Sequence, residues 1–557
     1  MELPSWASVL VIVLAAVVFL LATILRHGRR AYRLPPGPNP WPIIGNLNLI
    51  GALPHRSIHE LSKRYGPLMQ LRFGSFPVVV GSSAEMARFF LKSHDIVFTD
   101  RPRTAAGKHT TYNYTDILWS PYGAYWRQAR KMCVTELFSA RRLESFEHIR
   151  GEEVRALLRD LHGAAAPVLL RDYLSTATLG VISRMVLGKK YVGVEGASAG
   201  NGGGGEGTSP AATPEEFKMM MDELFLLSGV LNIGDFIPWL DWLDLQGYIR
   251  RMKRVGKKLD RFMEHVLDEH DKVRRQQGDR FAARDLVDVL LQLADDPNLE
   301  VQLRRDNVKA LTQVIDPFSS SYCSFLYSGD RPFHGTRCKL ALPYVVQDLI
   351  AGGTDTSAIT VEWAISELLR KPEILAKATE ELDRVVGRGR LVTETDMPSL
   401  PYVEAIVKET MRVHPVAPLL APHVAREDAS VGGYDIPAGM RVLVNVWTIA
   451  RDPALWDSPE EFMPERFIGS KIDVKGQDFQ LLPFGSGRRM CPGHSLGLKV
   501  IQLSLASLLH GFEWRLPDGV SAGELSMEEV FGLSTPRKVP LEVVVKPKLP
   551  AHLYTGP

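Results

Sequence analysis

The spacing of apolar and polar positions predicts that helices make up most of this chain. Apolar residues recur every three or four positions, which is the repeat that gives a helix one buried face. The repeat is clearest in four stretches, 150–161, 214–231, 248–275 and 358–386, and a final helix is predicted over 493–509. We therefore expect amphipathic helices that pack on one another around an apolar core.

Shorter runs have the character of strands. Residues 76–80 read FPVVV, and β-branched and aromatic residues of this kind fit the pleated surface of a sheet. Similar runs alternate with helical stretches near the N-terminal end of the globular part, and mixed strand and loop sequence returns after Pro418. The expected fold class is mainly α with small β-sheets.

The chain begins with an uncharged apolar run at positions 6–25. At about 1.5 Å per residue, a helix of this length crosses a hydrocarbon core of roughly 30 Å. Several arginines follow directly between positions 26 and 33, and by the positive-inside rule they hold the rest of the chain in the cytosol. A cleaved signal peptide is the alternative, and the length of the run disfavours it. The predicted organisation is a single transmembrane anchor with its basic flank at 1–33, a stiff proline-rich hinge at 34–45 and one large domain at 46–557.

Composition narrows the classes of partner. The apolar content of 45% and charged content of 23% are those of an ordinary globular protein. A formal net charge of +2 gives no basic field that would attract nucleic acid, so no nucleic-acid partner is expected. The 4 cysteines form no C-x-x-C pair, which disfavours a zinc knuckle, a disulfide framework and covalent attachment of a c-type haem. So few thiols in a long chain are typical of the reducing side of a membrane.

One cysteine lies in a segment with several constrained positions. Residues 484–493 read FGSGRRMCPG and fit the pattern F-x-x-G-x-R-x-C-x-G. A lone cysteine is usually just a small buried hydrophobe. The match of all constrained positions within one short segment favours a different interpretation, in which Cys491 is a thiolate ligand to a metal.

Each neighbour of Cys491 suits a thiolate that binds haem iron. Phe484 can shield the sulfur, and Arg489 can donate to a haem propionate. Gly487 and Gly493 let the backbone approach the porphyrin because they carry no Cβ. A helix that begins at Pro492 would direct its N-terminal dipole at the sulfur and lower the pKa of the thiol.

This segment resembles the haem-binding signature of the cytochrome P450 family, and the resemblance covers almost the whole chain after the anchor. It implies the cytochrome P450 fold, haem b (iron protoporphyrin IX) as cofactor and Cys491 as the iron ligand. The implied activity is a monooxygenase reaction, in which O₂ is activated and one oxygen atom enters a small organic substrate. It also implies an NADPH-dependent cytochrome P450 reductase as electron donor and a place in the endoplasmic reticulum membrane, with a single span and the catalytic domain cytosolic.

Further motifs agree with the resemblance. Trp126 and Arg130 match W-x-x-x-R, one helical turn apart, which in the family holds a haem propionate. His423 occupies a position that implies a further propionate contact. Asp355 and Thr356 lie in a Gly-Gly-Thr-Asp-Thr-Ser run that resembles the oxygen-activation signature of the family. The glycines would permit a helix bulge there, and the pair would relay protons; a turn or capping cluster is the alternative.

The family's E-x-x-R pair resembles Glu409 and Arg412, which would form a buried charge network with Arg466 of the later P-E-R-F sequence. We interpret this network as structural. The same spacing occurs elsewhere, and we interpret those pairs as solvated helix charges: Glu367 with Arg370, and Glu381 with Arg384.

Residues 314–347 do not fit their surroundings. They contain prolines and cysteines and cannot be helical throughout, yet 306–313 joined directly to 348–352 would read as one helix. The segment begins with valine, whose codons start with GT, and ends with glutamine, which has a codon ending in AG. We hypothesise an aberrant insertion from a retained intron or a gene-prediction error, and sequencing of the transcript tests this. If the segment is made, it interrupts the helix over the haem.

The resemblance also suggests a substrate class. The chain is similar to plant microsomal (A-type) members of secondary metabolism, such as flavonoid 3'-hydroxylases. The implied pocket walls are mostly apolar or hydroxylic and favour an apolar or phenolic, flavonoid- or terpenoid-like substrate. Two alternatives stay open, a haem-thiolate isomerase or dehydratase that needs no reductase, and a haem-binding protein inactivated by 314–347. The implied walls are 104–119, Phe225, Gly353, Thr356, 416–420 and 533–535.

Overall fold

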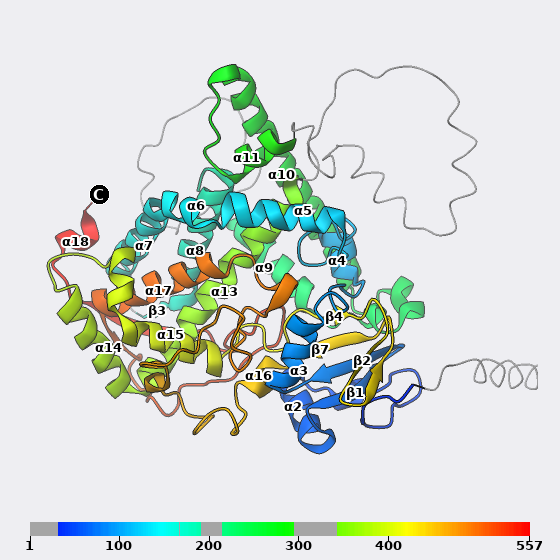
Figure 1. Cartoon of the computed structure of the whole chain (residues 1–557). Coiled ribbons are helices and arrows are strands. Elements are labelled where there is room, and N and C mark those ends of the chain that lie inside the picture. The colour runs from blue at the N-terminus through cyan, green and yellow to red at the C-terminus, as the bar shows by residue number, and fades with distance from the viewer. Residues whose placement is uncertain (1–31, 166, 191–213, 295–341, 557) are drawn as a thin grey trace, which may run out of the picture.

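The computed structural model describes residues 32–165, 167–190, 214–294 and 342–556. Helices form most of the molecule, and a small sheet lies at one side of it (Figure 1). The predicted mainly α fold class with small sheets is therefore confirmed. Within the described ranges no helix combines the length and apolarity needed to cross a bilayer. The predicted membrane span at 6–25 lies outside these ranges, as does most of 314–347.

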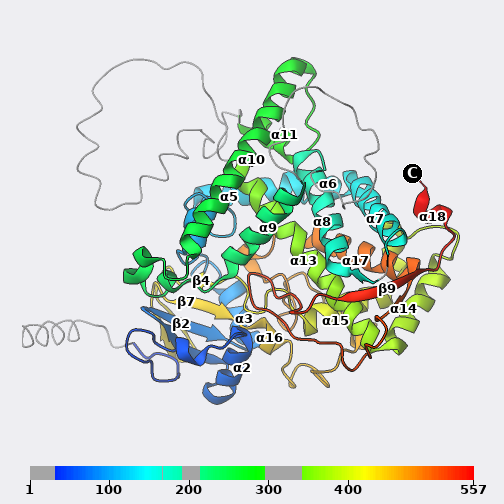
Figure 2. The ribbon, with the colours of Figure 1, turned by 180° about the vertical axis from the view of Figure 1, so that it is seen from behind.

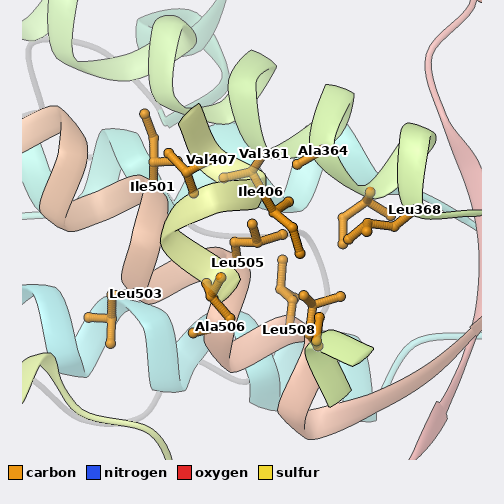
Figure 3. Close-up of a cluster of buried hydrophobic side chains, with 14 of the residues drawn as sticks. Val361, Ala364, Leu368, Ile406, Val407, Ile501, Leu503, Leu505, Ala506 and Leu508 are labelled. Carbon is orange, nitrogen blue, oxygen red and sulfur yellow. The ribbon is translucent and has the colours of Figure 1, made fainter. Parts of the chain in front are cut away.

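Three helices meet in the largest part of the core. They are α13 (Leu342–Arg370), α15 (Pro401–Val413) and α17 (His494–Gly511). Figure 3 shows apolar side chains from all three pointing into the same space, and these side chains are buried. Helix α13 also packs along α8 (Leu170–Leu187), so it runs through the centre of the protein. The labelled side chains include Val361 and Leu368 of α13, Ile406 and Val407 of α15, and Ile501, Leu505 and Leu508 of α17.

The main sheet joins early and late parts of the chain. Its order is β1-β2-β7-β4, and β2 covers the predicted strand at 76–80. Strands β1 and β2 are antiparallel, β2 and β7 are parallel, and β4 and β7 are antiparallel. This register places His423 of β4 opposite Val442 of β7. The strands are β1 (Leu68–Phe73), β2 (Phe76–Gly81), β4 (His423–Val424) and β7 (Arg441–Val444).

Most predicted helices are confirmed, with shifts of a few residues at their ends. The prediction of one helix over 358–386 is wrong, because α13 ends at Arg370 and α14 (Pro372–Val385) follows. Lys371 leaves the helical region, with φ −128° and ψ 74°. The ring of a following proline disfavours helical backbone at this position, and Pro372 then starts the next helix. The confirmed helices are α7 (Glu147–His162), α9 (Pro214–Gly229), α10 (Tyr248–Gln277) and α17 (His494–Gly511).

The predicted network around Glu409 is confirmed. The Glu409 and Arg412 side chains are both 0% exposed. Arg412 donates to both carboxylate oxygens of Glu409 at 2.7 and 2.8 Å, and Arg466 Nε donates to Glu409 Oε1 at 3.1 Å. The other N–H groups of Arg412 bond backbone carbonyls, including that of Ala450 at 2.7 Å. The buried charges are therefore fully paired, which is the condition under which they can be tolerated.

The interpretation of the other two glutamates as solvated helix charges is wrong. Glu367 is buried, and its carboxylate lies 2.7 Å from Nε2 of His414. Glu381 is also buried, and it accepts the backbone N–H groups of Tyr402 and Val403, where the next helix begins. A carboxylate satisfies the free N–H groups of a helix N-terminus well. Helical spacing alone could not show these partners, because they come from other parts of the chain.

Candidate active site

A cavity of about 550 Å³ lies among the central helices. We call it the central cavity. Most of the predicted wall is confirmed, including parts of 104–119, Phe225, Gly353, Thr356 and 416–420. At the C-terminal end Leu533 lines the cavity, but the wall continues through Gly532 and Phe531 and not through Thr535 as predicted. Its lining residues come from segments far apart in the sequence, between Leu47 and Leu533, so only the folded chain assembles it.

Cys491 lines the central cavity from a tight loop that precedes α17. The backbone N–H of Cys491 donates to the carbonyl of Phe484 at 3.0 Å, which closes the loop. The backbone N–H of Gly493 bonds the thiol. Phe484 and Gly493 line the same cavity. The structure thus brings the predicted cysteine, phenylalanine and glycine together at one end of the cavity.

The pKa of the Cys491 thiol is raised by its protein surroundings, whereas the sequence predicted that it would be lowered. Helix α17 begins at His494, two residues later than predicted. Burial raises the pKa of the Cys491 thiol, and the Gly493 N–H and the charge of Arg130 lower it by less. Desolvation of the sulfur therefore outweighs the helix N-terminus. A metal cation bonded to the sulfur is what holds such a buried group as a thiolate.

Gly487 is required by the packing of the protein itself. Its φ is +68°, and a Cβ at this position would lie 1.8 Å from the carbonyl oxygen of Leu91. The close approach of these two backbone segments therefore demands a glycine, whatever its predicted place beside a cofactor. Gly493 has an ordinary φ of −89°, and a Cβ there would only touch the Phe138 ring at 3.4 Å.

Three arginines line the central cavity without an ion-pair partner. They are Arg101, Arg130 and Arg489. No carboxylate in the described part of the chain lies within ion-pair distance of these guanidinium groups. Burial lowers the pKa of all three, that of Arg489 to about 10. Positive charges buried in this way favour an anionic group in the cavity beside them.

Backbone carbonyls and an aromatic ring hold Arg489. It donates to the carbonyls of Thr99, Ile117 and Ser120 at 2.7, 3.1 and 2.6 Å. Its guanidinium lies 4.3 Å from the centre of the Trp126 ring, a cation–π contact. Trp126 Nε1 donates to the same Ile117 carbonyl at 3.0 Å. Trp126 therefore orients Arg489, and its own N–H is already occupied.

Sequence reasoning missed Arg101. This residue donates to the carbonyls of Ala421 and Pro422 at 2.7 and 2.9 Å, and to that of Leu118 at 3.2 Å. Its partners are up to 321 positions away, so no local spacing could indicate the role. Charged residues such as Asp100 and Arg103 lie beside it in the sequence, so its charge did not distinguish it from its neighbours.

His423 lines the cavity beside these arginines. Its Nδ1 lies 2.6 Å from the carbonyl of Phe98, and a carbonyl only accepts, so Nδ1 carries the proton. Burial, followed by the charge of Arg101, lowers the pKa of His423 well below its ordinary value. The ring is therefore neutral, and Nε2 is an acceptor until an anion beside it raises the pKa again.

Helix α13 forms the opposite wall. Gly353, Thr356 and Ser357 line the cavity, and Thr356 Oγ1 donates to the carbonyl of Gly352 at 2.8 Å. The helix is continuous α-helix here, without the bulge that the glycines were expected to permit. Instead, a Cβ on Gly353 would lie 3.0 Å from Ile182, so this glycine allows α13 to pack closely on α8.

Asp355 does not share the cavity wall with Thr356. Adjacent residues on a helix face different directions. Burial, followed by the nearby charge of Asp222, raises the pKa of Asp355 to about 6, while Arg171 and Lys218 lower it. The two residues predicted to act as a pair are therefore on different sides of α13, one at the cavity and one toward α8 and α9.

A protein-family model described as Cytochrome P450 matches residues 35–315 and 340–541. The chain belongs to the cytochrome P450 family. Its relatives include trimethyltridecatetraene synthase of Zea mays, which is 50% identical and covers 99% of this chain and 95% of its own length. Dimethylnonatriene synthase of Zea mays is 49% identical over 100% of both chains. Flavonoid 3'-monooxygenase of Arabidopsis thaliana is 42% identical and covers 98% of each.

The solved structures agree with the P450 assignment. A zebra fish cytochrome P450 with abiraterone superposes with a TM-score of 0.65 at 26% identity, over 89% of this chain and 100% of that one. The predicted family, its P450 fold and its flavonoid 3'-hydroxylase relatives are thus confirmed. The enzyme is a cytochrome P450 monooxygenase, and its cofactor is haem.

Proposed function

We propose that this P450 binds haem b in the central cavity, with Cys491 as the iron ligand, and oxidises an acyclic terpenoid-like substrate. The observation that carries this proposal is the buried thiol of Cys491 in one cavity with three guanidinium groups that have no carboxylate partner in the described ranges. A haem would supply both missing groups, a metal cation for the sulfur and propionates for the arginines.

The proposed roles follow from these contacts. Arg130 and Arg489 hold the propionates together with Arg101, and Trp126 keeps Arg489 in place by stacking. His423 becomes a donor to a propionate when that anion raises its pKa. The Phe484 ring and the backbone at Gly493 surround the sulfur. Haem, when bound, supplies the activation of O₂, and electrons come from an NADPH–cytochrome P450 reductase.

Thr356 and Asp355 have separate proton-handling roles in this proposal. The Thr356 hydroxyl lies at the cavity wall and holds a proton at Oγ1. Asp355, on the outer side of α13, exchanges protons with solvent because its pKa of about 6 is close to physiological pH. Water that enters between α13 and α9 would connect the two groups.

Asp355→Asn is expected to stabilise the fold while it lowers turnover. The carboxyl pKa rises from 3.8 to about 6 on folding, so its ionised form destabilises the protein. This cost is absent below about pH 4 and fully present above about pH 6. Denaturant unfolding should show the variant more stable by about 1–3 kcal/mol at pH 7 and unchanged near pH 4. Equal stability at both pH values, with normal product formed per NADPH, would contradict this role.

The relatives favour a terpenoid-like substrate over a flavonoid. The two maize relatives are named for branched, unsaturated hydrocarbon products, and they are more similar to this chain than the flavonoid 3'-monooxygenase is. The walls of the cavity around Phe225, Leu419 and Leu533 are apolar. A flexible branched chain can fill such a cavity without leaving polar groups unpaired.

Reconstitution with the reductase tests this function. Microsomes with the enzyme and NADPH–cytochrome P450 reductase would receive an acyclic sesquiterpene alcohol or a flavanone, and products would be measured with and without NADPH. We expect NADPH-dependent oxidation of the terpenoid at a rate at least about tenfold above that of the flavanone. If only the flavanone were oxidised, the terpenoid substrate class would be wrong and a flavonoid substrate would take its place. Conversion without reductase or NADPH would favour the isomerase or dehydratase alternative.

The same experiment should include a version without residues 314–347. The family model leaves 316–339 unmatched, which supports the proposal that an insertion lies there. Helix α13 begins at Leu342, close to the proposed junction. We expect the shortened version to turn over substrate. A full-length version with a thiolate spectrum but no turnover would support the inactivated haem protein as the alternative.

An exposed apolar surface supports the proposed membrane anchor at 1–33. Trp239 and Trp242, in the turn before α10, are 60% and 80% exposed, and Trp41 and Ile43 are 62% and 61% exposed. Figures 1 and 2 place the start of the described chain and this turn at the same edge of the molecule. Exposed tryptophans of this kind suit the interface of a bilayer. Release from endoplasmic reticulum membranes by a high-salt wash would argue against the anchor.

A further inference from the structure

Two charged residues of the central cavity have no place in the proposed haem site. Asp235 and Arg441 line the cavity, whereas its other charged side chains, Asp116 and the three arginines, act on one another. The charges that act on Asp235 are those of Arg441 and Asp241, and the arginines of the haem site are not among them. The cavity therefore has a second polar end, which lies against the main sheet because Arg441 belongs to β7.

The position of Asp235 is fixed from several directions. It ends the turn η4 (Ile233–Asp235), and its Oδ1 accepts the backbone N–H of Ala105 at 2.6 Å. The carbonyl of the next residue, Phe236, accepts the N–H of Ser75 at 2.8 Å, which ties this turn to the β1–β2 hairpin. Arg441 donates to the backbone carbonyl of Asp235 at 2.9 Å. The carboxylate is thus held at the cavity wall by rigid elements.

The charge of this end is balanced, although the two side chains form no ion pair. Asp235 and Arg441 are not within ion-pair distance of any charged partner in the ranges described. Burial raises the pKa of Asp235 to about 6, while the Ala105 N–H, the Asn232 side chain and the charge of Arg441 lower it. Burial lowers the pKa of Arg441 to about 10, and Asp235 raises it. Each charge therefore offsets the other. A neutral hydrogen-bond donor suits this environment better than a cation, which Arg441 would repel, or an anion, which Asp235 would repel.

Much of the remaining wall is apolar. Phe225, Leu419 and Leu533 belong to it and offer no hydrogen bond to a polar group, whereas uncharged hydroxyls such as that of Ser228 are weaker acceptors than a carboxylate. A substrate hydroxyl buried against these side chains would lose its hydrogen bonds to water, which is costly. The same hydroxyl placed at Asp235 would donate to a charged acceptor, which is among the strongest hydrogen bonds in proteins.

We infer that Asp235 determines substrate specificity by accepting a hydrogen bond from a hydroxyl group of the substrate, so that the hydrocarbon end points to Cys491. This inference rests on the proposed function and names the orientation of its substrate. It also assigns the substrate class more narrowly, as a neutral acyclic alcohol with a single donor at one end. Arg441 is a positioning residue that holds the Asp235 turn and balances its charge.

Binding of a matched ligand pair tests the inference. Farnesol and farnesyl methyl ether share one hydrocarbon chain, and the ether replaces the hydroxyl hydrogen by a methyl group, so its oxygen cannot donate. Titration of the haem absorption spectrum measures the affinity of each. The native enzyme is expected to bind the alcohol about tenfold or more tightly than the ether. Asp235→Ala should weaken the binding of the alcohol and change the affinity for the ether by no more than about twofold. The ratio of the two affinities should then be close to one.

Two further variants separate specificity from folding. Asp235→Asn keeps an acceptor for the Ala105 N–H and should fold normally, yet it loses the charge and should give an intermediate ratio. Asp244→Asn is the matched control, because Asp244 also accepts a backbone N–H, that of Ile249 at 2.9 Å, but does not line the cavity. The control should keep the native ratio.

The outcomes distinguish the inference from the function on which it rests. Equal affinity of the native enzyme for alcohol and ether, or equal weakening of both by the Asp235 variants, would overturn the inference even when NADPH-dependent oxidation of the alcohol persists. Absence of binding and oxidation of both compounds would overturn the proposed substrate class, and the inference with it.

Discussion

Cys491→Ala is expected to remove the thiolate signature from the reduced carbon monoxide difference spectrum and to reduce turnover to the background of the reductase alone. Alanine fills less space than cysteine, so the loop closed by the Cys491 N–H and the Phe484 carbonyl can persist. What is lost is the only thiol that lines the central cavity among the described residues. Without it no thiolate can donate to iron, and the oxygen chemistry of the family requires that donation.

Cys133→Ala is the matched control for this prediction. Cys133 is a buried cysteine, with 1% exposure, and it does not line the cavity. Its replacement should leave the thiolate spectrum and the turnover rate near their native values. An unchanged haem spectrum in Cys491→Ala, measured on protein of native haem content, would overturn the assignment of the iron ligand.

Arg412→Met is expected to lower the free energy of unfolding by about 3–5 kcal/mol, because it leaves the buried Glu409 carboxylate without its main partner. Both side chains of the pair are 0% exposed, so water cannot replace the lost hydrogen bonds. Methionine fills a similar volume, which keeps the effect electrostatic and not one of packing. Denaturant unfolding followed by circular dichroism measures the change.

Arg370→Met provides the comparison at a pair with the same spacing whose arginine is exposed. Arg370 is 42% exposed and lies 4.0 Å from Glu367, which has a closer partner in His414. Its loss should cost about 1 kcal/mol or less. If Arg412→Met were no more destabilising than Arg370→Met, the Glu409 network would not be a major support of the core.

Local sequence was informative where one short segment contains all the residues that a function needs. The segment around Cys491 predicted the cofactor and the family because its constrained positions are neighbours in the chain. The pair Glu409 and Arg412 was predicted for the same reason, since a spacing of three places both on one helix face. The break at Pro372 was equally visible in the sequence, but the apolar repeat on both sides of it led to the prediction of a single helix.

Other features depended on distant partners. Arg101 is held at the proposed haem site by the carbonyls of Ala421 and Pro422, which meet it only in the fold. Asp235 looks like an ordinary turn residue, and its place at the cavity wall follows from contacts with α4 (Ala105–Thr110) and β7. No spacing could indicate either role.

The sequence by itself determined the helical class and the family, and it predicted the iron ligand, because apolar periodicity and a contiguous motif are properties of neighbouring residues. Only the tertiary structure decided the balance of electrostatic effects. Burial depends on everything packed around a group, so the structure reversed the expected pKa shift of the Cys491 thiol and separated Asp355 from Thr356. It also brought together, from distant parts of the chain, the arginines that lack carboxylate partners at one end of the cavity and the balanced Asp235 and Arg441 at the other.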